Sequence, residues 1–144
     1  MARPKIYFCA SITGGRQDAP IYREMIAFMK LHADVLTEHI GELGSMGEKH
    51  AGDRLIHDRD LEWLRSADAV IAEVTQPSLG VGYELGRAVE WGKPILCLYR
   101  PSEGRRLSGM IAGSQGIRTE HYQQPAEAMQ LIGQFIRERG WPLT

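Results

Sequence analysis

The chain has 144 residues, of which 43% are hydrophobic and 24% are charged, and its formal net charge is -1. This size and balance are typical of a single folded domain, so we expect one domain over residues 1–144. A net charge near zero argues against a nucleic acid polymer as partner, and no apolar run approaches the roughly 18 residues of a membrane helix. The N-terminus does not have the layout of a signal peptide, and we expect a cytoplasmic protein.

The two cysteines, Cys9 and Cys97, each lie inside an apolar run. This position is typical of buried free thiols in a reducing compartment. No metal-ligand spacing connects these cysteines with the five histidines. The spacing of these residues therefore gives no sign of a metal site.

Apolar runs alternate with helical patterns along the whole chain. Strands are predicted at five runs: Lys5–Ala10, Ala33–Thr37, Asp68–Val74, Pro94–Tyr99 and Gly116–His121. Helices are predicted between them and at the end: Pro20–Leu31, Asp53–Arg65, Val81–Trp91, Leu107–Ala112 and Pro125–Arg139. Asp18 or Gln17 is expected to cap the first helix, and Glu38–Gly52 reads as a long loop that borders a site.

This alternation predicts an α/β fold, a doubly wound five-stranded parallel sheet with helices on both faces. The expected strand order is 2-1-3-4-5, as in flavodoxin-like proteins. In that order a ligand binds outside the carboxyl ends of strands 1 and 3. Two turns rich in small residues, Ser11–Arg16 and Thr75–Gly82, leave the sheet at this point, and Tyr7 on strand 1 is close to it.

Two carboxylates lie on helix faces that are otherwise apolar. At 100° per residue, Glu84 is about 60° from Val81, and Asp60 is about 40° from Ile56. Two such acids in one cleft suggest cleavage of a glycosidic bond, with Glu84 as the nucleophile near a helix N-terminus and Asp60 as the proton-handling group. The turns at Ser11–Gly15 and at Ser78 would hold a phosphate.

Structural explanations compete with each of these assignments. Glu84 and Asp60 could be buried ion-pair partners of Arg87, Arg16 or Arg54. Tyr7 could be an ordinary core tyrosine, and His39 and His57 could be local hydrogen-bonding residues. Neither small-residue turn matches a P-loop or a dinucleotide-binding motif, so each turn alone is a weak signal.

Several motifs in colinear order nevertheless resemble one family. They are Tyr7-Phe8-Cys9-Ala10-Ser11-Ile12, Gly14-Gly15-Arg16, Leu36-Thr37-Glu38-His39, Asp53-Arg54-Leu55-Ile56-His57, Asp60-Leu61-Glu62-Trp63-Leu64 and the block from Glu73 to Ala88. Together they are similar to the 2′-deoxynucleoside 5′-phosphate N-hydrolase (Rcl) family, whose wider relatives are the nucleoside 2-deoxyribosyltransferases. The similarity runs from about Ile6 to Ala112.

The resemblance implies a small homodimeric hydrolase without a cofactor. Its substrate would be a nucleoside 5′-monophosphate, cleaved to a free base and 2-deoxyribose 5-phosphate through a glycosyl-enzyme intermediate. The family's catalytic residues fall on Glu84 as nucleophile, on Asp60 and on Tyr7. A serine from the neighbouring subunit falls on Ser108. Other substrate-binding residues fall on Ser11, Ile12, Gly14, Gly15, Arg16, His39, Ser78 and Gly80.

One residue departs from the family pattern. Thr13 stands where the animal enzymes carry arginine, and losing that cation should weaken a contact to base or phosphate. The loop from Gly41 to Gly52 is also shorter than expected. The preferred base, and the choice between deoxynucleotides and ribonucleotides such as CMP, therefore stay open. So do a deoxyribosyltransferase and a non-catalytic nucleotide-binding module.

Overall fold

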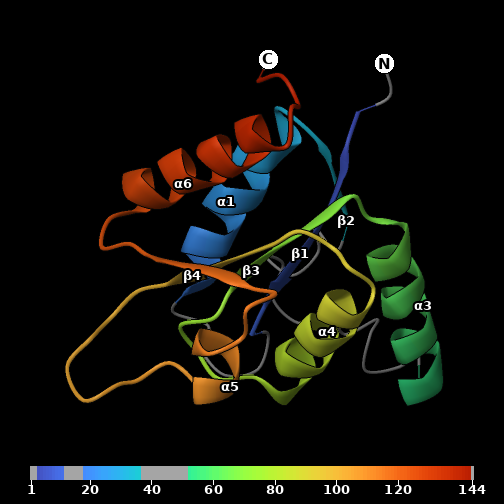
Figure 1. The fold of residues 1–144 in the computed structure, drawn as a ribbon, viewed down its shortest axis with the longest axis horizontal. Helices are drawn as coiled ribbons and strands as arrows, with labels where there is room; N and C mark the ends of the chain where they lie inside the picture. The colour runs from blue at the N-terminus through green and yellow to red at the C-terminus, as the bar shows by residue number, and fades with distance from the viewer. Residues whose placement is uncertain (1–2, 12–17, 37–51, 144) are drawn as a thin grey trace.

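The computed structural model describes residues 3–11, 18–36 and 52–143. One five-stranded parallel sheet organises these residues, in the order β2-β1-β3-β4-β5 (Figure 1). The strands are β1 (Lys5–Ala10), β2 (Asp34–Leu36), β3 (Ala69–Glu73), β4 (Ile95–Tyr99) and β5 (Arg118–His121). The helices are α1 (Ala19–Lys30), α3 (Asp53–Ser66), α4 (Leu79–Glu90), α5 (Gly109–Ala112) and α6 (Pro125–Glu138). The predicted fold class and strand order are confirmed.

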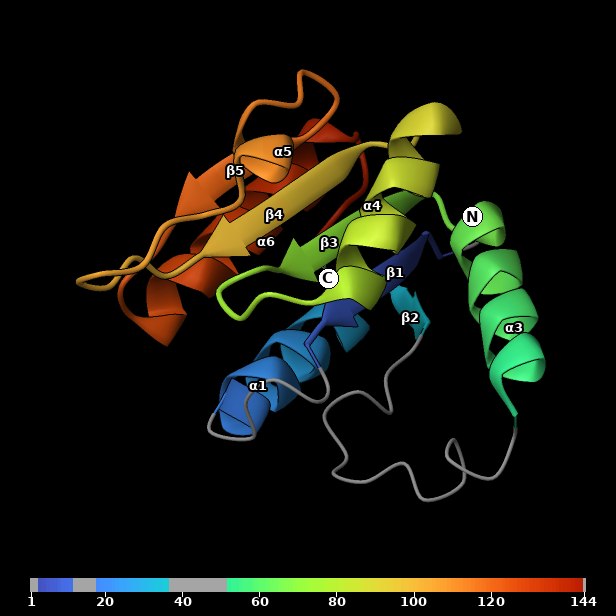
Figure 2. The ribbon, with the colours of Figure 1, turned by 90° about the horizontal axis from the view of Figure 1, so that it is seen from below.

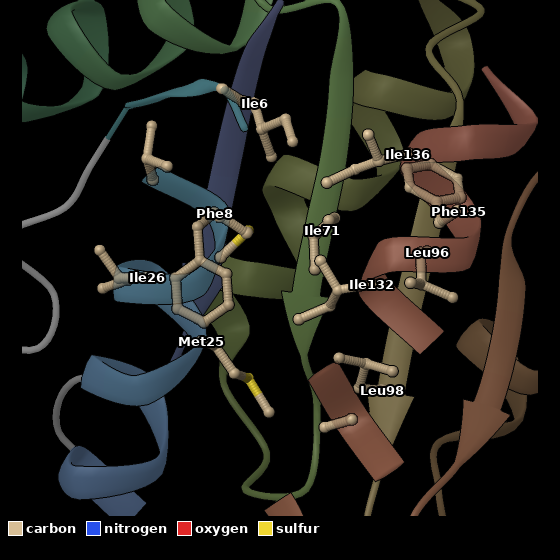
Figure 3. Packing of buried hydrophobic residues seen from close by; sticks show 14 of the residues in the cluster. Ile6, Phe8, Met25, Ile26, Ile71, Leu96, Leu98, Ile132, Phe135 and Ile136 are labelled. Atoms are coloured by element: carbon tan, nitrogen blue, oxygen red, sulfur yellow. The ribbon is translucent and has the colours of Figure 1, made fainter. Parts of the chain in front are cut away.

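Alternate side chains of the strands supply two separate cores. Ile6 and Phe8 of β1 point to one face, where α1 and α6 cover the sheet, and Figure 3 shows this packing. Tyr7 and Cys9 point to the other face, where they pack with residues of α3 and α4. Because side chains alternate along a strand, one apolar run can face both helix layers. The view in Figure 2 shows α3 and α4 side by side on this second face.

Two local predictions need correction. Asp18 stands at the N-cap position of α1, but its side chain makes no capping hydrogen bond. Its carboxylate instead accepts a hydrogen bond from the Arg100 guanidinium, at 2.8 Å between Oδ1 and Nη2. Helix α4 begins at Leu79, two residues before the predicted start, because Ser78 caps it there and accepts from the Val81 N–H at 3.2 Å.

Some predicted features lie outside the described residues. They include most of the turn Ser11–Arg16 and of the loop Glu38–Gly52, with the predicted site residues Ile12, Gly14, Gly15, Arg16 and His39. Within the described ranges, no helix has the length and apolar character needed to cross a membrane. Cys9 and Cys97 are both buried and free, as predicted.

Candidate active site

Tyr7 and Glu84 meet on the side of the sheet that α3 and α4 cover. Tyr7 lies in the middle of β1 and is almost completely buried. Its hydroxyl donates a hydrogen bond to Oε2 of Glu84, which is partly buried on α4. The two residues are 77 positions apart in the sequence, so the sheet topology brings them together. Tyr7 is therefore a core residue that also contacts the predicted nucleophile.

The surroundings of Tyr7 keep its hydroxyl protonated. Burial raises the pKa of Tyr7 far above its usual value, and the negative charges of Cys9 and Glu84 raise it further. A hydroxyl that holds its proton this firmly is a hydrogen-bond donor at every physiological pH. Its function toward Glu84 is thus to orient and stabilise the carboxylate rather than to accept a proton from it.

Glu84 lies farther along its helix than the sequence suggested. Because α4 begins at Leu79, Glu84 is in the second turn, where the field of the helix N-terminus has weakened. Of the predicted apolar stripe of this helix, Val81, Leu85 and Ala88 are buried, but Val89 is exposed.

Asp60 lies on α3 and faces the same region of the sheet. Its side chain is 23% exposed. After burial, the charges of Asp60 and Glu84 are both among the causes that raise the pKa values of Tyr7 and Cys9. Both acids therefore act electrostatically on the same part of β1.

An arginine that the sequence did not single out holds Asp60. Arg59 donates to Oδ1 of Asp60 from both Nε and Nη2, at 3.1 and 2.9 Å. The Arg59 guanidinium also lies over the Trp63 ring, 4.8 Å from its centroid. Adjacent residues in sequence rarely face each other on a helix, so spacing alone gave no signal for this pair.

The arginines considered as structural partners make other contacts. Arg54 pairs with Asp58 at 3.8 Å, and the Arg87 guanidinium lies over the rings of Tyr83 and Trp91. Arg16 lies outside the described residues. His57 bonds locally, as the structural explanation predicted, with Nδ1 at 2.9 Å from Oδ1 of Asp58, and its Nε2 also lies 2.9 Å from the hydroxyl of Tyr83 on α4.

The predicted phosphate-binding residues that the structure describes lie on three separate segments. Ser78 caps the helix and Gly80 is in its first turn, where backbone N–H groups have no carbonyl partner within the helix. Ser11 is buried immediately after β1. Ser108 caps α5 through the Met110 N–H at 3.2 Å and is exposed.

A cavity of about 680 Å³ separates α4 from the segment around α5. We call it the α4–α5 cavity. Ser78 and Ser108 both line it, but among the described residues neither Tyr7 nor Glu84 does. Most of its wall is apolar, with side chains of Val81, Leu85, Tyr99, Leu107 and Ile111. The structure thus joins Tyr7 to Glu84 and groups Ser78 and Ser108 at a separate cavity, instead of lining one cleft with all the predicted site residues.

The described residues offer no obvious metal site. Among them, no three side chains of His, Cys, Asp or Glu are grouped closely enough to hold a metal ion. The two acids predicted as catalytic instead accept hydrogen bonds, Glu84 from Tyr7 and Asp60 from Arg59.

Comparison with known proteins identifies relatives of this chain. The family model for nucleoside 2-deoxyribosyltransferase matches residues 6–129. A 5-hydroxymethyl-dUMP N-hydrolase of Tetraodon nigroviridis is 64% identical over 113 residues, which are 76% of this chain and 80% of that protein. A Trichoplax adhaerens protein, provisionally named 2′-deoxynucleoside 5′-phosphate N-hydrolase 1, is 53% identical over 142 residues, covering 96% and 97% of the two chains.

A solved structure shares the fold at low sequence identity. A CMP N-glycosidase of Clostridium botulinum superposes with a TM-score of 0.67 at 19% identity, covering 90% of this chain and 98% of that one. The family match and the identities above 50% agree with the family that the sequence motifs resemble. This chain belongs to the nucleoside 2-deoxyribosyltransferase family, and within it to the 2′-deoxynucleoside 5′-phosphate N-hydrolases.

Proposed function

We propose that this protein hydrolyses the N-glycosidic bond of 2′-deoxynucleoside 5′-monophosphates, releasing a free base and 2-deoxyribose 5-phosphate. The observation that carries the proposal is the hydrogen bond from Tyr7 to Glu84, with Asp60 on the same side of β1. Relatives at 53–64% identity carry N-hydrolase names, which supports the same reaction here. The proposal assigns the reaction to one domain over residues 1–144.

The reaction would proceed in two steps. In the first, a carboxylate oxygen of Glu84 attacks C1′ while the C1′–N bond breaks, and its electron pair leaves with the base, which takes up a proton. In the second, water attacks C1′ of the glycosyl ester, the C1′–O bond to Glu84 breaks, and the water gives up a proton. Both steps pass through a positively charged, oxocarbenium-like sugar that a nearby carboxylate stabilises.

Tyr7 and Asp60 would have different tasks. Tyr7 orients Glu84 through its hydrogen bond, because its own proton is held by burial. Asp60 would handle the proton, given to the leaving base or taken from water. The two hydrogen bonds from Arg59 to Oδ1 restrict the orientation of the Asp60 carboxyl group.

The phosphate of the substrate would bind at the carboxyl ends of β1 and β3. Ser11, Ser78 and Gly80 are at this edge of the sheet, and the start of α4 supplies N–H groups and a favourable dipole. The resemblance adds Ile12, Gly14, Gly15, Arg16 and His39 to this set, and their participation stays a prediction.

A homodimer is part of the proposal. Leu79 and Met110 beside the α4–α5 cavity are 97% and 84% exposed, and an apolar surface of this kind is typical of an interface. A second copy seated on it would place its own Ser108 close to the Ser78 turn, as the resemblance implies. The same proposal includes a cytoplasmic location, which two free buried thiols support.

The test is base release from a panel of nucleotides. Purified protein is incubated with 5-hydroxymethyl-dUMP, dTMP, dGMP, dCMP and CMP, and free base is separated by chromatography. We expect release from at least one deoxynucleotide and loss of that activity in Glu84→Ala, with an unchanged circular dichroism spectrum. Base exchange on an unphosphorylated nucleoside would instead support a transferase. Tight binding without base release over hours would support a binding module.

A further inference from the structure

A second group of buried polar side chains lies beside the candidate active site and has no part in the proposed chemistry. It gathers at the carboxyl ends of β3 and β4, and we call it the β3–β4 polar network. Its members are Asp18, Glu73, Thr75, Gln76, Arg100 and Tyr122.

Arg100, the first residue after β4, joins this network at three points. Its guanidinium donates to Oδ1 of Asp18 at 2.8 Å and to the hydroxyl of Tyr122 at 3.0 Å. Its backbone N–H donates to Oγ1 of Thr75 at 2.9 Å. Asp18 is buried, so this ion pair is largely removed from water.

Glu73, at the end of β3, is the most deeply buried member of the network. Its carboxylate is completely buried and accepts from the Thr75 N–H at 2.8 Å and from Oγ1 of the same residue at 2.6 Å. The Tyr122 hydroxyl donates to it at 2.5 Å. Because a buried carboxylate must keep its hydrogen-bond donors, these three contacts favour one conformation of the turn after β3.

Gln76 extends the network toward the substrate-binding segments. Its amide nitrogen donates to Oδ2 of Asp18 at 3.4 Å, and its amide oxygen accepts from Arg105 at 3.0 Å. Gln76 is two residues before Ser78, and Arg105 is three residues before Ser108. Asp18 follows, in sequence, the segment in which the resemblance placed Gly15 and Arg16.

The network therefore joins the turn between β3 and α4, which carries Ser78 and precedes Gly80, to the segment that follows β4. Buried ion pairs add little stability compared with apolar packing, but they impose one geometry on the groups that they join. We propose that Arg100 is a positioning residue: through the hydrogen bonds of its guanidinium to Asp18 and Tyr122 it fixes the turn between β3 and α4 that binds the 5′-phosphate, and so sets the affinity for the nucleotide.

This inference rests on the proposed function for its ligand, but binding can be measured without catalysis. Glu84→Ala provides a background in which turnover is not needed. In that background, Arg100→Met is compared with Arg118→Met by calorimetric titration with 2-deoxyribose 5-phosphate and with 5-hydroxymethyl-dUMP. Arg118 is the matched control because it makes two ion pairs, at 2.9 Å with Glu120 and 2.5 Å with Glu138, on the far edge of the sheet.

We expect Arg100→Met to raise both dissociation constants on the order of tenfold to a hundredfold, as displaced binding groups do. Binding of unphosphorylated deoxyuridine should change much less, and Arg118→Met should match the background. With Glu84 present, Arg100→Met should raise KM more than it lowers kcat, and Arg100→Lys should restore part of the loss.

Native affinity in folded Arg100→Met would overturn the inference, as would a loss of kcat at unchanged KM. If Arg100→Met does not fold, Asp18→Asn and Arg100→Lys decide the question, because both keep a polar group at the network. Native affinity in both of these variants would equally overturn it. Absence of base release in the native protein, with the binding differences intact, would refute the proposed reaction and leave the positioning role standing.

Discussion

Removing the Tyr7 hydroxyl should test the orientation of Glu84 separately from the nucleophilic attack by Glu84 itself. Tyr7→Phe deletes the hydrogen bond to Glu84 and leaves the aromatic ring in the core. Removing one positioned donor beside a developing charge typically lowers kcat by about a hundredfold or somewhat more. We expect that loss with a small change in KM, measured by steady-state base release.

Tyr22 offers the control for this substitution. It is also buried, but its hydroxyl has no hydrogen-bond partner in the part of the chain that the structure describes. Tyr22→Phe should therefore keep native activity and native or slightly higher stability. Equal activity losses in the two variants would mean that the Tyr7 hydroxyl has no specific function.

The buried carboxyl group of Glu73 should make the stability of the folded protein depend on pH. Burial raises the pKa of Glu73, and hydrogen bonds from Thr75 and Tyr122 offset only part of this increase. The folded protein thus holds the Glu73 proton more tightly than the unfolded chain, whose value is near 4.5. The contribution of Glu73 to the free energy of unfolding is then fully present below the unfolded value and declines as pH rises through the folded pKa.

The experiment compares native protein with Glu73→Gln by urea denaturation from about pH 4 to about pH 8. The free energy of unfolding of the native protein, relative to that of Glu73→Gln, should fall as pH rises across this range. Glu62→Gln, at an exposed position of α3, is the control and should show no such trend. A relative stability that rises with pH would contradict the assignment.

At the scale of elements, the start of α4 combines a structural and a binding role in one serine. Ser78→Ala should lose the cap and about 1 kcal/mol of stability, together with the proposed phosphate contact. Ser78→Asp keeps a capping oxygen but places a negative charge at the phosphate position. We expect native stability and a strongly raised KM in Ser78→Asp. A native KM in this variant would place the phosphate elsewhere.

The sequence predicted the elements well where they depend on residues close together in the chain, and less well where they depend on distant contacts. The strands and their order followed from apolar runs such as Ile6–Ala10 and from their alternation with helices, and the structure has both. The start of α4 was placed two residues late, because Gly80 and Gly82 suggested a turn and the Ser78 cap was not recognised. Asp18 was assigned to a cap because its partner Arg100 is 82 positions away.

The residues of the candidate site also fall into two groups, those that the sequence indicated and those that it did not. Glu84 and Asp60 stood out because a carboxylate interrupts an apolar helix stripe, and in the structure Glu84 accepts a hydrogen bond from Tyr7 of β1. Arg59 and the β3–β4 polar network were missed, since they depend on contacts that only the folded chain creates. Glu73 carried a usable signal, because it is a charge at the end of a strand that is otherwise apolar.

At the scale of the whole molecule, the exposed apolar residues beside the α4–α5 cavity predict a dimer that is needed for activity. Leu79→Glu combined with Met110→Glu puts two charges on this surface without disturbing a buried core. We expect a monomer by sedimentation velocity, with native secondary structure and greatly reduced base release. Leu55→Glu, at an exposed position on α3, should stay dimeric and active.

A mixed dimer shows which subunit's serine serves which site. Combining Glu84→Ala chains with Ser108→Ala chains leaves one fully intact site only if Ser108 acts across the interface. We then expect mixed dimers to be more active than either parent. Activity no higher than expected from the Ser108→Ala chains alone would assign Ser108 to its own subunit's site. In the earlier experiment, a protein with both Leu79→Glu and Met110→Glu that still dimerises would place the interface elsewhere.

The most direct measurement of the central claim is the capture of the covalent intermediate on Glu84. A deoxynucleotide analogue with fluorine at C2′ slows both steps, because fluorine destabilises the oxocarbenium-like states through which they pass. Peptide mapping by mass spectrometry after incubation should find 2-fluorinated sugar phosphate attached to the peptide at Glu84, and none in Glu84→Gln. Base release with no adduct, or with an adduct on another residue, would contradict the assignment of Glu84 as nucleophile.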